Sequence, residues 1–346
     1  MNENFGEGLK GEDGRNPGYL RHLLTFLQLA VTCGLLAWLF WDSERREAMW
    51  VALVAADWRW MLAAIAAAGV CEYFGILRWR IFLRMLHVDV PMGQMSRLFF
   101  IGAFFNQFLP GTTGGDVVRV IFLMQERPMN KTEGLLSVAV DRLLAVIVLM
   151  VMGLAFAWGR HGWFAQSFSV GNLMRGFAIT LFVMLSGLVV SFIITRRHLL
   201  ARLPRRMPFR KKIIKLSTLW QLCLENRRDA LLGTFFTVPM LLAYFTAFTF
   251  AARAFIPPEQ IGFEKLFFDM TSVMPLVTAV SSLPISLNGI GVREALFSEI
   301  LADLFYQPRG VGVLISIGGM LVYLLWGLLG AFFYLERIHG NFRKKE

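Results

Sequence analysis

The chain has 346 residues, of which 56% are hydrophobic, and its mean hydropathy is +0.56. A soluble protein is rarely this apolar, so the composition excludes an ordinary soluble domain and indicates an integral membrane protein. Apolar segments near the length of a membrane span, without the alternation of barrel strands, favour the helical type. The formal charge of +11 is therefore interpreted first as a sign of membrane topology, with nucleic-acid binding a distant second.

Several segments are long and apolar enough to cross a bilayer as helices. They are 20–41, 58–79, 132–158, 174–195, 231–255 and 310–335. A mixed polar and apolar connection is expected over 42–57, and a polar loop over 159–173. Residues 196–229 are strongly basic, and their apolar positions recur at helical spacing, which predicts an amphipathic helix on the membrane surface. Residues 1–19 are expected to form a disordered cytoplasmic tail, and 338–346 a basic one.

Two further apolar segments, 97–126 and 263–303, are interrupted by residues that break helices. The first contains Pro110-Gly111 and Gly114-Gly115, with a new helix expected near Asp116, and the second contains Pro284 and two glycines. Proline has no N–H and glycine readily takes positive φ, so a continuous span is not expected in either segment. Both segments carry the pattern L-P-x4-G-x2-V-R at corresponding places in the two halves of the chain, which favours an internal duplication.

The distribution of arginine and lysine predicts the orientation. The basic stretch 196–229 and both termini are placed in the cytoplasm. Following the spans from there, 97–126 enters and leaves on the cytoplasmic side, and 263–303 on the outer side. Each is predicted to be a re-entrant helical hairpin, so that the halves 20–158 and 159–337 form an inverted-topology repeat of about six full transmembrane helices and two hairpins, typical of transporters. The alternative is that the broken segments are short full spans, with eight transmembrane helices.

Helices that begin at membrane depth suggest a binding site. Free N–H groups and the positive end of the helix dipole point into any polar cavity there, and glycines allow an anion to approach closely. Arginine adds a planar fork that can hold two phosphate oxygens. The candidate residues for binding an anionic headgroup are Asn106, Gly114, Gly115, Asp116, Arg119, Asp141, Arg142, Asn288, Gly289, Gly291, Arg293 and Glu294.

Structural roles for the same residues remain open. The glycines could serve the bends alone, Arg119 could pair with Asp116 and Arg293 with Glu294, and Asp141 could pair with a hairpin arginine. The asparagines beside the breaks could cap exposed backbone. Two further acids at membrane depth, Glu72 and Asp269, are candidates for proton coupling. The three scattered cysteines and the dispersed histidines predict no metal site and no disulfide framework, and we expect no cofactor.

Three sequence motifs resemble a known family. They are N-x2-L-P-G-x2-G-G-D-x2-R over 106–119, the Asp-Arg pair 141–142, and L-P-I-S-x-N-G-I-G-V-R-E-A over 283–295. They are similar to motifs of the flippase-like membrane family, which includes the transmembrane domain of bacterial lysyl-phosphatidylglycerol synthase. The resemblance covers about 20–337 and implies movement of a lipid across the bacterial cytoplasmic membrane. Large family members continue into a soluble aminoacyltransferase domain; this sequence ends at Glu346, so lysyl transfer is not expected here.

The leading hypothesis is therefore a lipid translocase whose partners are membrane lipids: an anionic or zwitterionic phospholipid, an aminoacyl lipid or a polyprenyl-phosphate carrier. Two alternatives remain. One is a membrane-embedded transferase acting on a polyprenyl phosphate, although no nucleophile–base constellation, metal motif or nucleotide loop is found in the sequence. The other is an accessory subunit that holds a soluble lipid-modifying enzyme at the membrane. We expect no enzymatic activity and no nucleic-acid partner.

Overall fold

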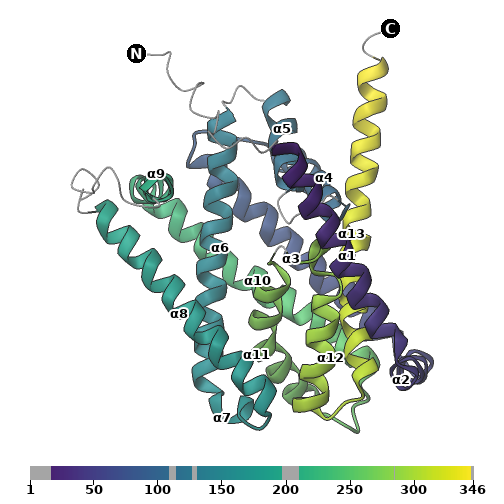
Figure 1. Ribbon diagram of the computed structural model, residues 1–346. Helices are drawn as coiled ribbons and strands as arrows, with labels where there is room; N and C mark the ends of the chain where they lie inside the picture. Colours follow the sequence, from purple (N-terminus) through teal and green to yellow (C-terminus); the bar gives the residue numbers. More distant parts are fainter. Residues whose placement is uncertain (1–16, 109–113, 127–130, 197–209, 284, 344–346) are drawn as a thin grey trace, which may run out of the picture.

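The computed structural model describes residues 17–108, 114–126, 131–196, 210–283 and 285–343 (Figure 1). Most of the predicted tail 1–19, the breaks at Pro110-Gly111 and Pro284, part of the basic stretch and the last residues of the C-terminal tail lie outside the described residues.

Within the described part of the chain, all regular elements are helices, which confirms an all-α integral membrane protein. In chain order they are α1 Pro17–Trp41, α2 Ser43–Val54, α3 Trp58–Arg84, α4 Met92–Phe108, α5 Gly114–Glu126, α6 Lys131–Gly159, α7 His161–Phe164, α8 Phe168–Arg196, α9 Arg210–Glu225, α10 Arg227–Phe255, α11 Phe263–Ser281, the short 3-10 turn η2 Leu287–Gly289, α12 Val292–Phe305 and α13 Arg309–Arg343.

Among the described residues, five helices are long and apolar enough to cross a membrane, namely α3, α6, α8, α10 and α13. Helix α1 joins them if it is counted together with α2, to which it is bent by 80°. The expectation of about six spans is thereby confirmed. In lipid, a spanning segment must satisfy its backbone hydrogen bonds internally, so apolar runs of this length fold as continuous helices.

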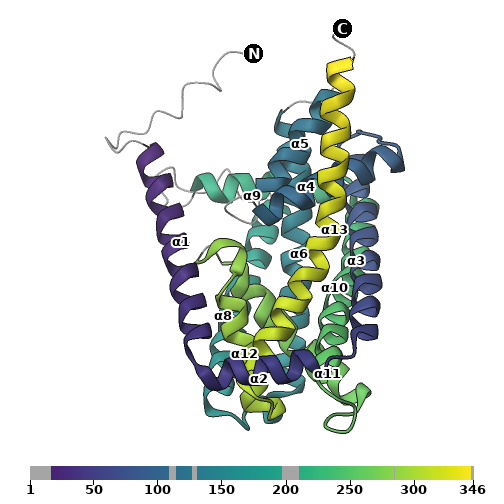
Figure 2. The same cartoon turned by 90° about the vertical axis from the view of Figure 1, so that its right-hand side faces the viewer.

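The connection 42–57 differs from its prediction, because it contains helix α2. The Asp42 side chain accepts a hydrogen bond from the N–H of Glu44 at 3.0 Å, an N-cap that starts a helix immediately after α1 ends. Helix α2 then lies across one end of the molecule (Figure 2). The sequence pattern gave a weak signal here, since α2 mixes charged and apolar residues and buries Arg45 along with Ala52.

The predicted polar loop 159–173 is likewise wrong in part, since α7 and the first turn of α8 occupy much of it. The amphipathic helix predicted within 196–229 is confirmed as α9. The second helix of the first broken segment begins at Gly114, before the predicted start near Asp116. Both glycines therefore belong to the first turn of α5, and are not a break ahead of it.

The two broken segments lie at opposite ends of the molecule (Figures 1 and 2). Helix α1 begins and α13 finishes at one end, here called the terminal end, and the opposite end is called the far end. Helices α4 and α5, called hairpin 1, occupy the half of the molecule toward the terminal end. Helices α11 and α12 with η2, called hairpin 2, occupy the far half. The two broken segments therefore occupy opposite halves of the molecule, while their re-entry into the membrane from opposite faces stays a prediction.

Close backbone contact holds hairpin 1 against the last span. A Cβ atom added to Gly330 of α13 would lie 1.9 Å from the carbonyl oxygen of Phe100 in α4. Only glycine permits this approach, since any side chain would overlap the neighbouring backbone. Hairpin 2 is held in the same way, because a Cβ on Gly312 would lie 2.5 Å from the carbonyl oxygen of Phe297. Helix α13 is therefore the common support of both hairpins.

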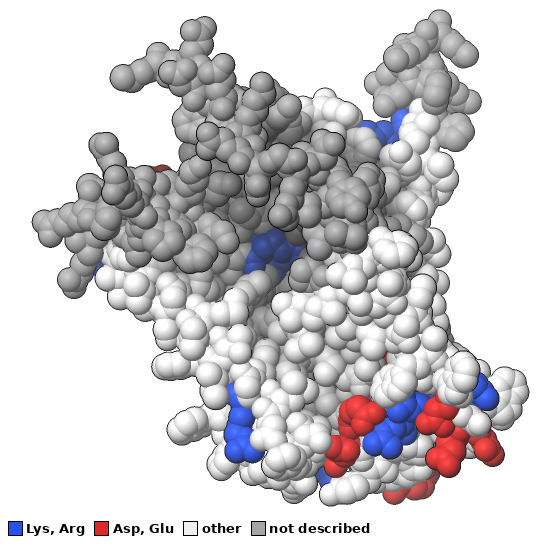
Figure 3. All heavy atoms as spheres, viewed as in Figure 1, with Lys and Arg blue, Asp and Glu red and all other residues white. Residues whose placement is uncertain are grey.

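The surface has the pattern of a membrane protein. On the face shown in Figure 3, acidic and basic residues gather at the far end, while the middle is uncharged except for basic atoms in a hollow. Helix α8 exposes large apolar side chains such as Ile179 and Phe182, which are 66% and 65% exposed. In water such a face would be unfavourable, whereas hydrocarbon covers it at no cost.

Candidate functional site

Hairpin 1 is closed by an asparagine cap. The Oδ1 atom of Asn106, near the end of α4, accepts a hydrogen bond from the N–H of Gly115 at 2.8 Å. This bond satisfies one of the free amide groups at the start of α5. A Cβ on Gly115 would lie 1.9 Å from the carbonyl oxygen of Gly102, so α4 and α5 approach each other at this glycine. The capping role of Asn106 and the packing role of Gly115 are both realised.

A cluster of charged side chains lies beside this cap, and we call it the arginine cluster. Asp116 receives Arg142 through Nη2 at 2.5 Å and Arg119 through Nη2 at 3.3 Å. Asp141 receives Arg119 at 3.4 Å and the Nε atom of Arg78 at 2.8 Å. The alternatives in which Arg119 pairs with Asp116 and Asp141 pairs with a hairpin arginine are therefore both confirmed. All five side chains except Arg142 are buried.

Aromatic and polar neighbours complete the cluster. The Arg119 guanidinium lies over the ring of Trp79, 4.3 Å from its centroid, where the ring's negative face favours a cation. The Oγ1 atom of Thr237 lies 3.5 Å from Nη1 of Arg78. Buried charges of this kind are tolerated in a membrane protein when they are paired inside the bundle.

Arg142 differs from its neighbours because it reaches the surface. Its side chain is 46% exposed although its partner Asp116 is only 2% exposed. It lines a cavity of about 480 Å³ between α6 and α8, whose other walls are apolar. These walls are formed by Ala139, Leu143, Val146, Met150, Met184, Gly187 and Leu188. The groove therefore combines hydrocarbon-like walls with one cationic group that leads into the arginine cluster.

Hairpin 2 has a tip of unusual backbone conformation. Asn288, Gly289 and Gly291 have φ values of 50°, 74° and 86°, a region that favours glycine and asparagine. The tip is also tightly packed, since a Cβ on Gly289 would lie 2.6 Å from the carbonyl oxygen of Ser281. These glycines are required by the turn itself, which supports their structural role.

The charged residues after this tip do not pair with each other. Arg293 donates from Nη2 to the carbonyl oxygen of Asn288 at 3.0 Å. The buried Glu294 carboxylate accepts from the N–H of Gly291 at 2.6 Å and from the hydroxyl of Ser316 at 2.7 Å. The alternative in which Arg293 pairs with Glu294 is therefore wrong. Consecutive residues point about 100° apart on a helix, and the glutamate turns back to cap α12.

The end of α4 contacts the tip of hairpin 2. The Nδ2 atom of Asn288 donates to Oε1 of Gln107, near the end of α4, at 3.3 Å. Helix α1 closes the other side, because the hydroxyl of Thr32 accepts from the N–H of Leu287 at 3.0 Å. Polar groups from both broken segments therefore meet inside the bundle.

The residues predicted for the site form two groups. The arginine cluster and its cap bring together the candidates of hairpin 1 and α6. The second group surrounds the tip of hairpin 2, and the Asn288–Gln107 contact joins the two. Near the second tip, the buried hydroxyls of Ser281 and Ser286 have no hydrogen-bond partner in the described chain. Buried polar atoms left without partners are expected to bind water or a ligand.

The two acids proposed for proton coupling have different surroundings. Asp269 is buried and forms a 2.6 Å ion pair with Arg160, whose guanidinium lies 4.0 Å from the centroid of Trp163. Glu72 lies near the midpoint of α3. No hydrogen bond or ion pair within the described ranges holds its carboxylate.

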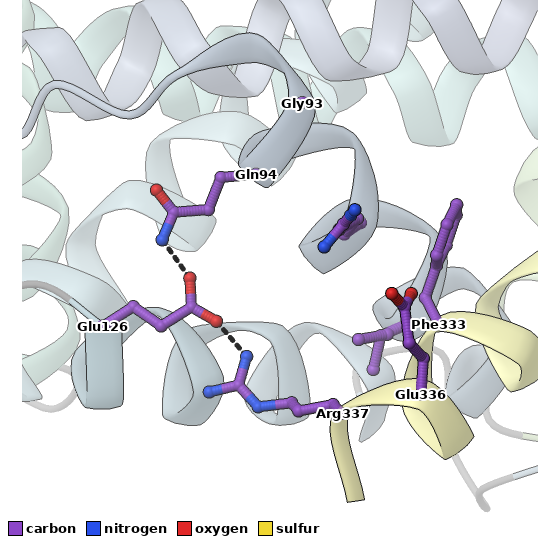
Figure 4. Close-up of a pocket in the computed structure, with 8 residues that line it drawn as sticks. Gly93, Gln94, Glu126, Phe333, Glu336 and Arg337 are labelled. Atoms are coloured by element: carbon purple, nitrogen blue, oxygen red, sulfur yellow. Dashed lines mark hydrogen bonds and ion pairs between the residues drawn. The ribbon is translucent and has the colours of Figure 1, made fainter. Parts of the chain in front are cut away.

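A second cavity of about 480 Å³ opens beside hairpin 1 near the terminal end (Figure 4). Glu126 at the end of α5 accepts hydrogen bonds from Gln94 of α4 and Arg337 of α13, as Figure 4 shows. The three helices are thereby linked at this end. Arg97 also lines the cavity, with its guanidinium 5.9 Å from the ring centroid of Phe333.

Sequence reasoning missed several partners of the site. Arg78, Trp79, Gln107 and Ser316 are not among the residues predicted from the sequence. Arg78 gave a weak signal, because its span also carries Glu72 and so is not purely apolar. Within the described chain, no group of three or more His, Cys, Asp or Glu side chains could hold a metal ion.

The fold and the site together define a multi-pass helical membrane protein with two short broken helical segments and a buried arginine cluster. A family model described as the lysylphosphatidylglycerol synthase TM region matches residues 25–331, so the chain belongs to that family. The chain is also 33% identical over 109 residues to a UPF0104 membrane protein of Pyrococcus horikoshii. That match covers 31% of this chain and 32% of the relative.

Proposed function

We propose that this protein moves a lipid with an anionic headgroup between the two leaflets of the bacterial cytoplasmic membrane. The observation that carries the proposal is the half-exposed Arg142 in the otherwise apolar α6–α8 groove. A lipid presents the same two parts, a phosphate and acyl chains. The guanidinium suits the phosphate and the groove walls suit a chain.

The route across the membrane passes the two hairpin tips. In the proposal, the headgroup leaves the groove at the arginine cluster and then reaches the contact between Gln107 and Asn288. Separation of these two side chains would open a path to the hydroxyls of Ser281 and Ser286, which have no partner in the described chain. Halves of opposite orientation favour an alternating-access motion around such a midplane site. The group recognised is the phosphate, which phospholipids and polyprenyl-phosphate carriers share. An aminoacyl lipid is an equal candidate for the transported lipid.

The proposal includes an orientation, with the terminal end in the cytoplasm. Helices α3 and α8 both end toward the terminal end, with Arg84 and Arg196 as their last residues, whereas α3 begins toward the far end, directly after Asp57 (Figure 1). The excess of basic residues on the cytoplasmic side is the basis of this assignment. Single cysteines at Gln125 and Glu259 are expected to react with an impermeant maleimide from the cytoplasmic and outer sides respectively. Labelling of both from one side would refute the orientation.

The proposal assigns no covalent chemistry to the site. The arginines bind and the asparagine and glycines shape the path, while no side chain acts as a nucleophile. The transport step is tested in liposomes with a fluorescent phosphatidylglycerol whose outer-leaflet signal is quenched by dithionite. A charge-assisted hydrogen bond contributes about 1.5–3 kcal/mol, so Arg142→Gln is expected to slow movement on the order of tenfold to a hundredfold.

The matched control is Arg175→Ala, which removes an exposed arginine of α8 that bonds Asn172. It is expected to leave the rate unchanged. Equal rates for Arg142→Gln, the control and the unmodified protein would refute the proposed headgroup site. Absence of movement by the unmodified protein with phosphatidylglycerol, an aminoacyl lipid and a polyprenyl phosphate alike would refute lipid translocation.

A further inference from the structure

We propose that the cavity at the open end of hairpin 1 binds a zwitterionic phospholipid whose headgroup carries a phosphate and a primary ammonium, as phosphatidylethanolamine does. This lipid site is distinct from the α6–α8 groove and does not depend on lipid movement. The cavity has a volume of about 480 Å³ and lies between the start of α4, the end of α5 and the last part of α13 (Figure 4). A volume of this size is typical of cavities that bind small ligands.

Four charged side chains line the cavity, and two of them neutralise each other. Glu126 accepts a hydrogen bond from Arg337, so this pair adds no net charge. The other two are Arg97 and Glu336, and neither forms an ion pair within the described residues. One cation and one anion of the cavity are therefore available to a ligand.

These two side chains lie on neighbouring helices. The guanidinium of Arg97, on α4, lies 5.9 Å from the ring centroid of Phe333, on α13. Glu336 follows Phe333 by three residues, and Figure 4 shows its carboxylate pointing from α13 into the cavity. Arg97 and Glu336 are both exposed, so a ligand can reach them without displacing a protein contact.

The surface of α13 next to the cavity indicates that the ligand is a membrane lipid and not a soluble zwitterion. Leu325, Leu329 and Phe332 precede Glu336 by eleven, seven and four residues, so they lie along the same side of the helix. Their side chains are 50%, 42% and 64% exposed. This apolar strip would fit the acyl chains of any lipid, whereas the charged residues at its end select the headgroup.

The two charges discriminate between phospholipids. The planar guanidinium of Arg97 suits the phosphate oxygens, and a primary ammonium has three donors for the Glu336 carboxylate. Phosphatidylglycerol has the phosphate without the ammonium, so it would leave the carboxylate unpaired beside a like charge. The quaternary ammonium of phosphatidylcholine has no N–H to donate. Phosphatidylethanolamine pairs both side chains, and its headgroup would thereby link α4 to α13.

The test is native mass spectrometry of the full-length protein in detergent micelles. The protein is titrated with phosphatidylethanolamine, phosphatidylglycerol and phosphatidylcholine of identical acyl chains. The first binding event is expected to be about tenfold tighter for phosphatidylethanolamine than for the other two lipids, which corresponds to one charge-assisted hydrogen bond.

Two variants separate the contributions of the two charges. Glu336→Gln is expected to abolish the preference and to bind phosphatidylglycerol at least as tightly as the unmodified protein does. Arg97→Gln is expected to weaken the binding of all three lipids, because each has a phosphate. The matched controls are Glu47→Gln on α2 and Arg59→Gln on α3, which change exposed side chains outside the cavity and should preserve the preference.

Equal affinities of the unmodified protein for the three lipids would overturn the site. So would a Glu336→Gln variant that keeps the preference, or one that binds all three lipids more weakly to the same extent, as a structural defect would. The readout is also independent of transport. A Glu336-dependent preference in a protein that moves no lipid in liposomes would support this site and overturn the proposed function.

Discussion

The arginine cluster allows a quantitative prediction about stability. Asp141 is 5% exposed and receives two guanidinium groups, from Arg78 at 2.8 Å and Arg119 at 3.4 Å. At an effective dielectric constant of about 20, a pair of unit charges about 4 Å apart interacts by about 4 kcal/mol. Arg119 keeps Asp116 as a partner when Asp141 is neutralised, whereas Arg78 keeps no other carboxylate within the described chain.

Asp141→Asn is therefore expected to lower the free energy of unfolding by about 3–5 kcal/mol, the usual cost of stranding a buried charge. This corresponds to a decrease in apparent melting temperature on the order of 10 °C. The control is Glu299→Gln, which removes the acid of an exposed pair with Arg309, 44% and 51% exposed, and a 3.7 Å contact with Arg45, which keeps Asp42 as its partner at 3.3 Å. An exposed pair contributes less than about 1 kcal/mol, so this variant should melt within about 3 °C of the unmodified protein.

The measurement is thermal unfolding in detergent micelles, followed by the loss of the monodisperse peak in size-exclusion chromatography. The double variant Asp141→Asn with Arg78→Met removes the stranded charge as well, and it is expected to regain part of the lost stability. Equal melting temperatures for Asp141→Asn and Glu299→Gln would refute the electrostatic reasoning. So would a double variant less stable than Asp141→Asn alone.

Three further predictions follow from particular contacts. Gly330→Ala is expected to destabilise the protein by about 3 kcal/mol, because its methyl group would overlap the Phe100 carbonyl. Gly176→Ala is the control, since a Cβ at Gly176 meets nothing within 4 Å and should leave the stability unchanged. Equal melting temperatures for the two variants would contradict the close contact at Gly330. A second variant carries Gln107→Cys and Asn288→Cys in a chain without its native cysteines. A short bifunctional thiol reagent is expected to join the two cysteines and to stop lipid movement. Continued lipid movement in the cross-linked protein would contradict the proposed separation of these two positions. Ser316→Ala is expected to cost about 1–3 kcal/mol by leaving one oxygen of the buried Glu294 unpaired, and an unchanged melting temperature would contradict that role.

Local sequence was sufficient for most helix positions and for the two broken segments. The reason is that hydrocarbon offers no hydrogen bonds, so an apolar run of about 20 residues must satisfy its backbone groups internally and forms a helix. Pattern also located the side chains that meet in the site. Asp116 and Arg119, three residues apart, could be predicted as a pair because they lie on one face of a helix.

The partners that define the site could be decided only by tertiary structure. Asn288 and Gln107 are separated by 181 positions along the chain, and a local pattern carries no information about which distant tip an amide will meet. Arg293 and Glu294 are adjacent in sequence yet bond in different directions, because a helix turns consecutive side chains apart. Hydrophobicity along the chain therefore determined which segments enter the membrane, while packing between the segments determined which charges are neutralised there, since pairing depends on distances that only the folded bundle sets.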